Sequence, residues 1–216
     1  IGVFDSGVGG ITVLNQVMHK LPYHELIYLS DGKYMPYGPR SVDFIAKRME
    51  QVIKYFEGQG CDVLFIACHS MASVFLQSVD SSSASSSYLE HFDRDLHQKM
   101  RIINTITPTV DHLNSNAAER VGIMATERTI ANKTYSDMLE EHVISNFPCK
   151  NLAAIIEDNA HKNRLVPDEF LAEILPESEL RGLDKLVLAC THYPHAMEQI
   201  KEWVHEHASQ CDVIDP

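Results

Sequence analysis

The chain has 216 residues, 44% of them hydrophobic and 22% charged, and these proportions exclude a disordered or fibrous protein. Eighteen Lys and Arg residues against 30 Asp and Glu residues give a formal charge of −12, which disfavours nucleic acid as a partner. An anionic ligand would have to be held by local donors against this overall field.

The cysteine pattern indicates a reducing compartment. The five cysteines are Cys61, Cys68, Cys149, Cys190 and Cys211. An odd and widely spaced set argues against a disulfide framework, and the absence of a C-x-x-C pair argues against a zinc ribbon. No apolar run approaches the length needed to cross a bilayer. The given sequence shows no signal peptide, and its start without Met leaves a removed leader open. We therefore expect a cytoplasmic protein with no membrane partner.

Short apolar runs alternate with amphipathic segments along the chain. Strands are predicted at Ile1–Phe4, Leu26–Leu29, Val63–Ala67, Val121–Ala125 and Leu186–Ala189, with weaker signals at Arg101–Ile106 and Val213–Ile214. Helices are predicted after Ser41 up to Gly58, from Thr129 to Glu141 and from His195 to His207. Because the strand runs are continuous rather than alternating, they indicate strands buried on both faces. Strand alternating with helix then predicts a parallel α/β sheet. A serine tract, Ser81 to Ser87, is predicted to be a surface connection or linker.

Two predicted strands end in a cysteine followed by hydroxyl and imidazole groups. Val63–Ala67 continues into Cys68-His69-Ser70, and Leu186–Ala189 continues into Cys190-Thr191-His192-Tyr193-Pro194. Ligands bind at the carboxyl ends of strands in open α/β sheets. The N-terminus of the following helix favours a thiolate. We therefore interpret these two cysteines as functional and the other three as structural.

Two further segments stand at predicted strand ends. Asp5 to Gly10 is rich in glycine and could cradle an anion with its N–H groups, although the spacing of a dinucleotide fingerprint fails. Asp5 there is as compatible with a cap or turn role as with acid catalysis. Asp31 to Arg40 has the proline and glycine content of a rigid loop or an ordinary turn.

Taken together, these motifs resemble those of glutamate racemases, in matching order and spacing from Ile1 to Asp215. The resemblance rests on Asp5-Ser6-Gly7-Val8-Gly9-Gly10, Pro36-Tyr37-Gly38-Pro39-Arg40-Ser41, Ala67-Cys68, Thr126-x-x-Thr129 and Cys190-Thr191-His192-Tyr193-Pro194. The first and last blocks together also distinguish this family from aspartate and hydantoin racemases.

The resemblance implies an α/β enzyme of two similar doubly wound domains with parallel sheets and the active site in the cleft between them. We expect residues 1–98 plus 211–216 in the first domain and 99–210 in the second. The family usually continues with a helix that completes the first domain, so we expect a truncated C-terminus. The implied activity is cofactor-independent interconversion of L- and D-glutamate, which supplies D-glutamate for peptidoglycan, in enzymes that commonly form homodimers.

The resemblance also assigns roles to residues. Cys68 and Cys190 are the acid and base on opposite faces of glutamate, with Asp5 and His192 assisting proton transfer. Glu157 is a weaker match to a further assisting glutamate. The expected substrate-binding residues are Ser6, Pro36, Tyr37, Gly38, His69, Ser70, Thr126, Thr129 and Thr191.

Inversion at the α-carbon explains why two cysteines are needed. A proton leaves one face and another arrives at the opposite face, so one cysteine must be a thiolate and the other a thiol. Hydroxyl and N–H donors would support the carbanion. No lysine is placed by a motif to form a pyridoxal Schiff base, so we expect no cofactor.

The sequence departs from the family pattern after the first cysteine. His69-Ser70-Met71 stands where the family has Asn-Thr-Ala, and Asp31-Gly32 stands where it usually has Asp-Thr. His69 could form an ion pair with Cys68 and lower the thiol pKa, or it could crowd the pocket.

Two alternatives to a racemase stay open. The protein could be a homologue that binds a small dicarboxylate with lost or altered chemistry, as the change at His69 suggests. It could also be a thiol hydrolase with Cys68 as nucleophile and His69 as base, a scheme that does not need Cys190.

Overall fold

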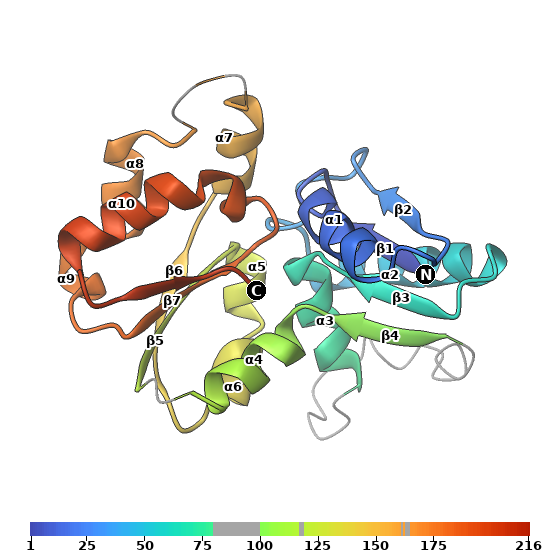
Figure 1. The fold of residues 1–216 in the computed structure, drawn as a ribbon, viewed down its shortest axis with the longest axis horizontal. Coiled ribbons are helices and arrows are strands. Elements are labelled where there is room, and N and C mark those ends of the chain that lie inside the picture. Colours follow the sequence, from blue (N-terminus) through green and yellow to red (C-terminus); the bar gives the residue numbers. More distant parts are fainter. Residues whose placement is uncertain (80–99, 117–118, 161, 163–164) are drawn as a thin grey trace. The chain divides into compact units, whose positions relative to one another are not determined.

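A computed structural model describes residues 1–79, 100–116, 119–160, 162 and 165–216 (Figure 1). The chain divides into two compact units, Ile1–Thr105 and Ile106–Pro216. Within the described residues, each unit is built on a four-stranded parallel sheet with helices between the strands. The predicted fold class is therefore confirmed. The serine tract at 81–87 lies outside the described residues.

The first unit has the strand order β2-β1-β3-β4, with all neighbouring strands parallel. Its elements are β1 (Gly2–Asp5), α1 (Ile11–Lys20), β2 (Ile27–Ser30), α2 (Val42–Gly58), β3 (Val63–Ile66), α3 (His69–Val79) and β4 (Arg101–Asn104). All four residues of β1 are buried, which agrees with its continuous apolar sequence at the centre of the sheet.

The amphipathic pattern of α2 directs one face of this helix into the core. Its N-cap is Ser41, whose side-chain oxygen accepts a hydrogen bond from the Phe44 N–H at 3.2 Å. The buried face includes Ile53 and Phe56. A Cβ atom at Gly2 would lie 2.4 Å from the Phe56 ring, so the missing side chain lets α2 pack directly onto β1.

The second unit repeats this arrangement with the strand order β6-β5-β7-β8, again parallel throughout. Its elements are α4 (Ile106–Asn114), β5 (Arg120–Ala125), α5 (Glu127–Ala131), α6 (Thr134–Met138), β6 (Val143–Pro148), α7 (Leu152–Asp158), α8 (Asp168–Ile174), α9 (Glu177–Leu180), β7 (Lys185–Ala189), the 3-10 helix η2 (Tyr193–Ala196), α10 (Met197–His207) and β8 (Asp212–Ile214). Helices α7, α8 and α10 lie over one face of the sheet, while α4, α5 and α6 lie over the other (Figure 1). Both faces of the central strands are therefore covered.

Two predictions for the second unit differ from the structure. Strand β6 was not predicted, because Ser145 and Asn146 interrupt its apolar run; the strand lies at the sheet edge, where such residues meet solvent. The helix predicted from Thr129 to Glu141 is two short helices, α5 and α6. They are separated at Lys133, whose positive φ of 55° a continuous helix does not allow.

Two segments belong to a different unit from the one expected from the sequence. We expected 99–105 in the second domain and 211–216 in the first. In the structure β4 pairs with β3, placing Ile102 opposite Leu64 in the first sheet. Likewise β8 pairs with β7, placing Val213 opposite Leu186 in the second. Backbone hydrogen bonding thus assigns these segments to the other units. Over the part of the chain that is described, no helix is long and apolar enough to span a membrane.

In each unit, the first strand lies between the second and the third. The chain therefore adds β2 on one side of β1, and then β3 and β4 on the other side. In the second unit it adds β6 on one side of β5, and β7 and β8 on the other. The carboxyl ends of β1 and β3, and those of β5 and β7, flank this change of direction. In open α/β sheets ligands bind at such a point. We therefore expect a ligand site at the carboxyl ends of these two strands in each unit.

Candidate active site

Cys68 lies at the end of β3, directly before the first residue of α3. Its carbonyl accepts the Ala72 N–H at 2.8 Å, as the residue preceding a helix does. The side chain is buried, and its Sγ atom donates to the Ser6 hydroxyl oxygen over 3.4 Å. Ser6 comes from the loop after β1. The ends of the neighbouring strands β1 and β3 are thus connected through this contact.

Cys68 is a thiol at neutral pH in this environment. Burial, and then the negative charge of Asp5, raise the pKa of Cys68 from 9.0 to about 12. The Ser6 hydroxyl and the N–H groups of Met71 and Ser6 can donate hydrogen bonds to the thiolate form, and they oppose this rise only in part. The expectation that the helix N-terminus favours a thiolate therefore does not describe this site. The donors are present, but desolvation and Asp5 outweigh them.

Asp5, at the end of β1, organises the glycine-rich loop that follows it. One carboxylate oxygen, Oδ2, accepts the N–H groups of Gly7 at 3.0 Å and Gly10 at 3.2 Å. A Cβ at position 10 would lie 2.5 Å from the Asp5 Cβ, so only glycine fits there. The Tyr28 hydroxyl donates to the Gly7 carbonyl at 2.8 Å. Asp5 is thus a turn-forming residue and also a charge beside Cys68.

His69 and Ser70 occupy the first turn of α3, and both are buried. Burial lowers the pKa of His69 from 6.5 to about 3, so the imidazole is neutral near pH 7. The ion pair with Cys68 considered from the sequence is therefore not supported, because neither partner carries its charge. The hydrolase alternative needs a neutral imidazole as its base, but a pKa of about 3 makes His69 a weak one. The Ser70 carbonyl accepts the Ser73 hydroxyl at 3.0 Å.

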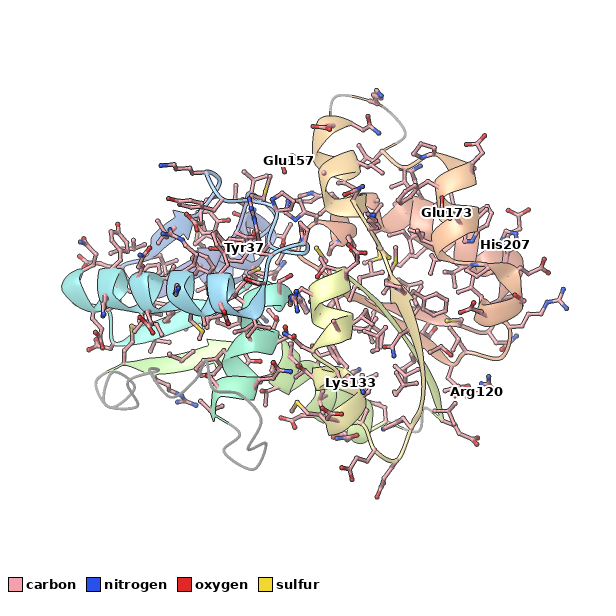
Figure 2. The ribbon with its side chains drawn as sticks, turned by 180° about the vertical axis from the view of Figure 1, so that it is seen from behind. Tyr37, Arg120, Lys133, Glu157, Glu173 and His207 are labelled. Carbon is pink, nitrogen blue, oxygen red and sulfur yellow. The ribbon has the colours of Figure 1, made fainter. Side chains whose placement is uncertain are left out.

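The loop that contains Pro36, Tyr37 and Gly38 is held by Asp31 and by Arg48, of which the sequence singled out only Asp31. Tyr37 is only 1% exposed, and its hydroxyl donates to Asp31 Oδ2 at 2.5 Å. Figure 2 labels Tyr37 within the first unit. The guanidinium of Arg48, on α2, donates to both oxygens of Asp31. Arg48 lies within the helix predicted after Ser41, and nothing in the sequence around it indicates this contact.

In the second unit, Cys190 directly follows β7 and is buried. Its Sγ atom lies 4.0 Å from Nδ1 of His192. The other ring nitrogen of His192, Nε2, lies 3.6 Å from Oε2 of Glu157, which α7 supplies (Figure 2). Thiol, imidazole and carboxylate therefore follow one another, with the two nitrogens of one ring facing the two partners. Such a relay can stabilise a thiolate as an ion pair with an imidazolium.

The three threonines expected at the substrate also lie in the second unit. Thr126 is the N-cap of α5, where its side-chain oxygen accepts the Thr129 N–H at 3.3 Å. The two hydroxyl oxygens are 3.1 Å apart, and both residues are buried. Thr191, which lies between Cys190 and His192 in the sequence, is also buried. The first two hydroxyls thus already take part in a helix cap.

Tyr193 is a buried neighbour of Cys190 that the sequence did not select. Burial, followed by the nearby Cys149 and Cys190, raises its pKa well above 10.0. The sequence signal that could have pointed to Tyr193 is its place within the Cys190-Thr191-His192-Tyr193-Pro194 block. Within the described residues, no three His, Cys, Asp or Glu side chains form a group that could hold a metal ion.

Each unit therefore presents one buried thiol at the end of the third strand of its sheet. The residue group of the first unit comprises Asp5, Ser6, Tyr37, Cys68, His69 and Ser70. The residue group of the second unit comprises Thr126, Thr129, Glu157, Cys190, Thr191 and His192. In both, a strand end places sulfur beside a further ionisable group.

Comparison with known proteins identifies the family. Residues 12–216 match Asp/Glu/Hydantoin racemase. The chain belongs to this family. Among its relatives, the glutamate racemase of Persephonella marina is 29% identical over 219 residues, covering 98% of this chain and 77% of the relative. That of Ralstonia nicotianae is 32% identical over 209 residues, covering 94% and 69%.

A solved structure shares the same architecture. The glutamate racemase of Francisella tularensis, determined in complex with D-glutamate, has a TM-score of 0.81 and 26% identity, covering 100% of this chain and 75% of that chain. The resemblance to glutamate racemases is thereby confirmed, and the chain is an isomerase of the amino-acid racemase type.

Proposed function

We propose that this racemase interconverts L- and D-glutamate by a cofactor-independent two-base mechanism, with Cys68 and Cys190 on opposite faces of the α-carbon. The observation that carries the proposal is the matched pair of thiols. Each lies buried at the end of the third strand of its own sheet, next to a second ionisable residue. The names of the relatives, and D-glutamate in one of their structures, support glutamate as the substrate.

Cys68 enters the proposed reaction as the proton donor. Its raised pKa keeps the proton on sulfur, where a thiol can deliver it to a carbanion. After delivery the thiolate lies beside Asp5, and the Ser6 hydroxyl and the N–H groups of Ser6 and Met71 support its charge. The α-ammonium group of the amino acid supplies a positive charge, since the residue group around Cys68 contains no Lys or Arg.

Cys190 enters as the base. As a thiolate paired with the His192 imidazolium, it takes the α-proton and becomes a thiol. Glu157, at 3.6 Å from the far ring nitrogen, stabilises the imidazolium. The C–H electron pair stays on the α-carbon until the Cys68 proton reaches the other face. The α-carbon has then lost one proton to Cys190 and gained one from Cys68 on the opposite face, which gives the other enantiomer. The two sulfurs have exchanged protonation states, so the reverse reaction can follow.

Binding of a dicarboxylate by a chain of charge −12 requires local donors. The proposed donors are the N–H groups of the loops after β1 and β2 and the hydroxyls of Ser6, Ser70 and Thr191. Oriented donors in a site protected from water bind an anion much more strongly than the same groups in solution. The overall charge thus gives no help to the substrate and does not forbid it.

Circular dichroism tests both the reaction and the substrate. The protein is incubated separately with L-glutamate and with L-aspartate, and the signal is followed to equilibrium. We expect the signal of glutamate alone to fall to zero as the racemate forms. Exchange of the α-proton in deuterated water is measured in parallel. If no tested amino acid loses its signal or exchanges its α-proton, the proposal is overturned. That result would favour a binding protein that retained only the fold.

A role in supplying D-glutamate for peptidoglycan follows as part of the same proposal, together with a cytoplasmic location and a homodimer. Growth of a bacterial strain that requires external D-glutamate tests the first. Rescue by the chain is expected, and its failure despite racemase activity in vitro would contradict this role. Light scattering after size-exclusion chromatography tests the homodimer through the molar mass.

A further inference from the structure

Arg48 and Asp31 form a two-point ion pair behind the loop that contains Tyr37. Nε of Arg48 donates to Oδ2 of Asp31 at 2.8 Å, and Nη2 donates to Oδ1 at 2.8 Å. The side chains are only 21% and 10% exposed. Parallel bonds between a guanidinium and a carboxylate fix orientation as well as distance. The third nitrogen, Nη1, donates to Gln51 on the same helix, so the arginine is fixed at three points.

This ion pair contacts the loop through two of its aromatic residues, Tyr37 and Tyr34. The Tyr37 hydroxyl donates to the same Asp31 oxygen, Oδ2, that accepts Nε of Arg48. The Arg48 guanidinium also lies over the Tyr34 ring, 4.4 Å from its centroid. Phe44, on α2, meets the Tyr37 ring edge-on with centroids 6.2 Å apart. Both sides of Pro36 are therefore anchored to one helix.

The anchored loop lies at the same end of the sheet as Cys68. Asp31 directly follows β2, and its N–H donates to the Asp5 carbonyl at 3.1 Å. The Tyr37 ring lies 6.3 Å from that of Phe4 in β1. Because its hydroxyl already donates to a buried carboxylate, Tyr37 contributes its ring and its backbone, and the hydroxyl serves as an anchor.

We propose that Arg48 is a positioning residue that, through Asp31, holds Tyr37 and the loop of Pro36 to Gly38 in the form that receives the substrate. The inference rests on the proposed function, since it takes this loop to bind glutamate. Arg48 does not touch the reacting atoms. Its loss should weaken substrate binding more than it slows proton transfer.

The test uses Arg48→Met, which keeps the length of the side chain but removes its charge and donors. Lys47→Met on the same helix is the matched control, because Lys47 is exposed and its loss changes the net charge equally. Loss of a charged hydrogen-bond partner is expected to raise KM for glutamate about ten-fold, with kcat within about two-fold. Lys47→Met leaves both constants unchanged. Arg48→Lys, which keeps the charge without the two-point geometry, recovers part of the loss.

A double-mutant cycle with Tyr37→Phe tests whether the residues act as one unit. If Arg48 acts through Asp31 on Tyr37, the double variant has a KM close to that of whichever single variant has the higher KM. Multiplication of the two single effects would overturn the proposal, as would an Arg48→Met enzyme with the KM of the wild type.

Hydrogen exchange of the 32–40 peptides gives a readout independent of activity. We expect faster exchange there in Arg48→Met than in Lys47→Met, with unchanged exchange in β5 and β7. Equal exchange in the two variants would overturn the positioning role. If the wild type does not racemise glutamate while the loop of Arg48→Met still loosens, the proposed function fails and the anchoring of the loop stands.

Discussion

Glu157 and Cys190 face opposite nitrogens of the same imidazole: Oε2 of Glu157 lies 3.6 Å from Nε2 of His192, whose Nδ1 lies 4.0 Å from Sγ of Cys190. Among the described residues, Glu157 Oε2 and His192 Nε2 have no hydrogen bond to another group, so no other partner competes for this contact. The carboxylate on α7 is thereby connected to the thiol after β7 through a ring between them.

Replacement of Glu157 by Gln tests this connection. The substitution keeps the shape but removes the charge that favours the imidazolium, so kcat should fall roughly ten-fold or more, as expected for a charged hydrogen-bonding partner. Thermal stability should change little, because Glu157 is partly exposed. Glu173→Gln, at an exposed glutamate of α8, is the control and should keep full activity. Wild-type kcat in the Glu157 variant would show that the carboxylate has no part in the relay.

The division of the five cysteines into two catalysts and three structural residues can be tested with serine variants. Cys190→Ser should lose at least about 1,000-fold in turnover, because a serine hydroxyl is a far weaker acid and base in this position. Cys211→Ser, at a partly exposed site, should retain the activity of the wild type. Racemisation is followed by circular dichroism. Undiminished turnover in Cys190→Ser would exclude the two-base scheme.

Burial of His69 predicts acid sensitivity. Its pKa is lowered to about 3, against 6.5 ordinarily, so between these values the unfolded chain binds a proton that the folded chain does not. The contribution of the neutral ring to stability is complete above pH 6.5 and is lost as pH falls toward 3. His69→Asn, which replaces the imidazole by an amide that does not titrate, should remove up to about 1.4 kcal/mol per pH unit from the slope of unfolding free energy over this range.

Denaturant titrations at several pH values measure that slope. His205→Asn, at an exposed position of α10, is the control and should leave it unchanged. The same slope in wild type and His69→Asn would mean that His69 takes up a proton in the folded protein as readily as in the unfolded chain.

Gly10 is expected to be intolerant of a side chain. An added Cβ would lie 2.5 Å from the Asp5 Cβ and 3.1 Å from the Tyr28 hydroxyl, so the carboxylate of Asp5 would have to move. Gly10→Ala should cost about 1–3 kcal/mol of stability, as overpacking does, and should lower activity. Gly58→Ala is the control, since nothing lies within 4 Å of its added Cβ. The two midpoints of thermal unfolding decide the comparison, and equal midpoints would contradict the prediction.

The sequence by itself determined the fold class and most of the strands. Continuous apolar runs such as Val63–Ala67 are a local property, and burial on both faces of a parallel sheet requires them. The strand-end motifs likewise predicted that Cys68 and Cys190 would each lie at the carboxyl end of a parallel strand, and each does so in its own sheet. Strand β6 was missed, since its polar residues are permitted only at the exposed edge of a sheet, which the local pattern does not specify.

Only the tertiary structure decided the protonation of the site and the residues that support it. The thiol state of Cys68 depends on desolvation and on the charge of Asp5, which comes from a different strand. Neutrality of His69 has the same origin, because burial is set by the packing of the whole unit. The pair of Arg48 and Asp31 joins residues 17 positions apart in the chain. Local sequence therefore provides the reactive groups, whereas their charge and orientation arise from neighbours that only folding brings into contact.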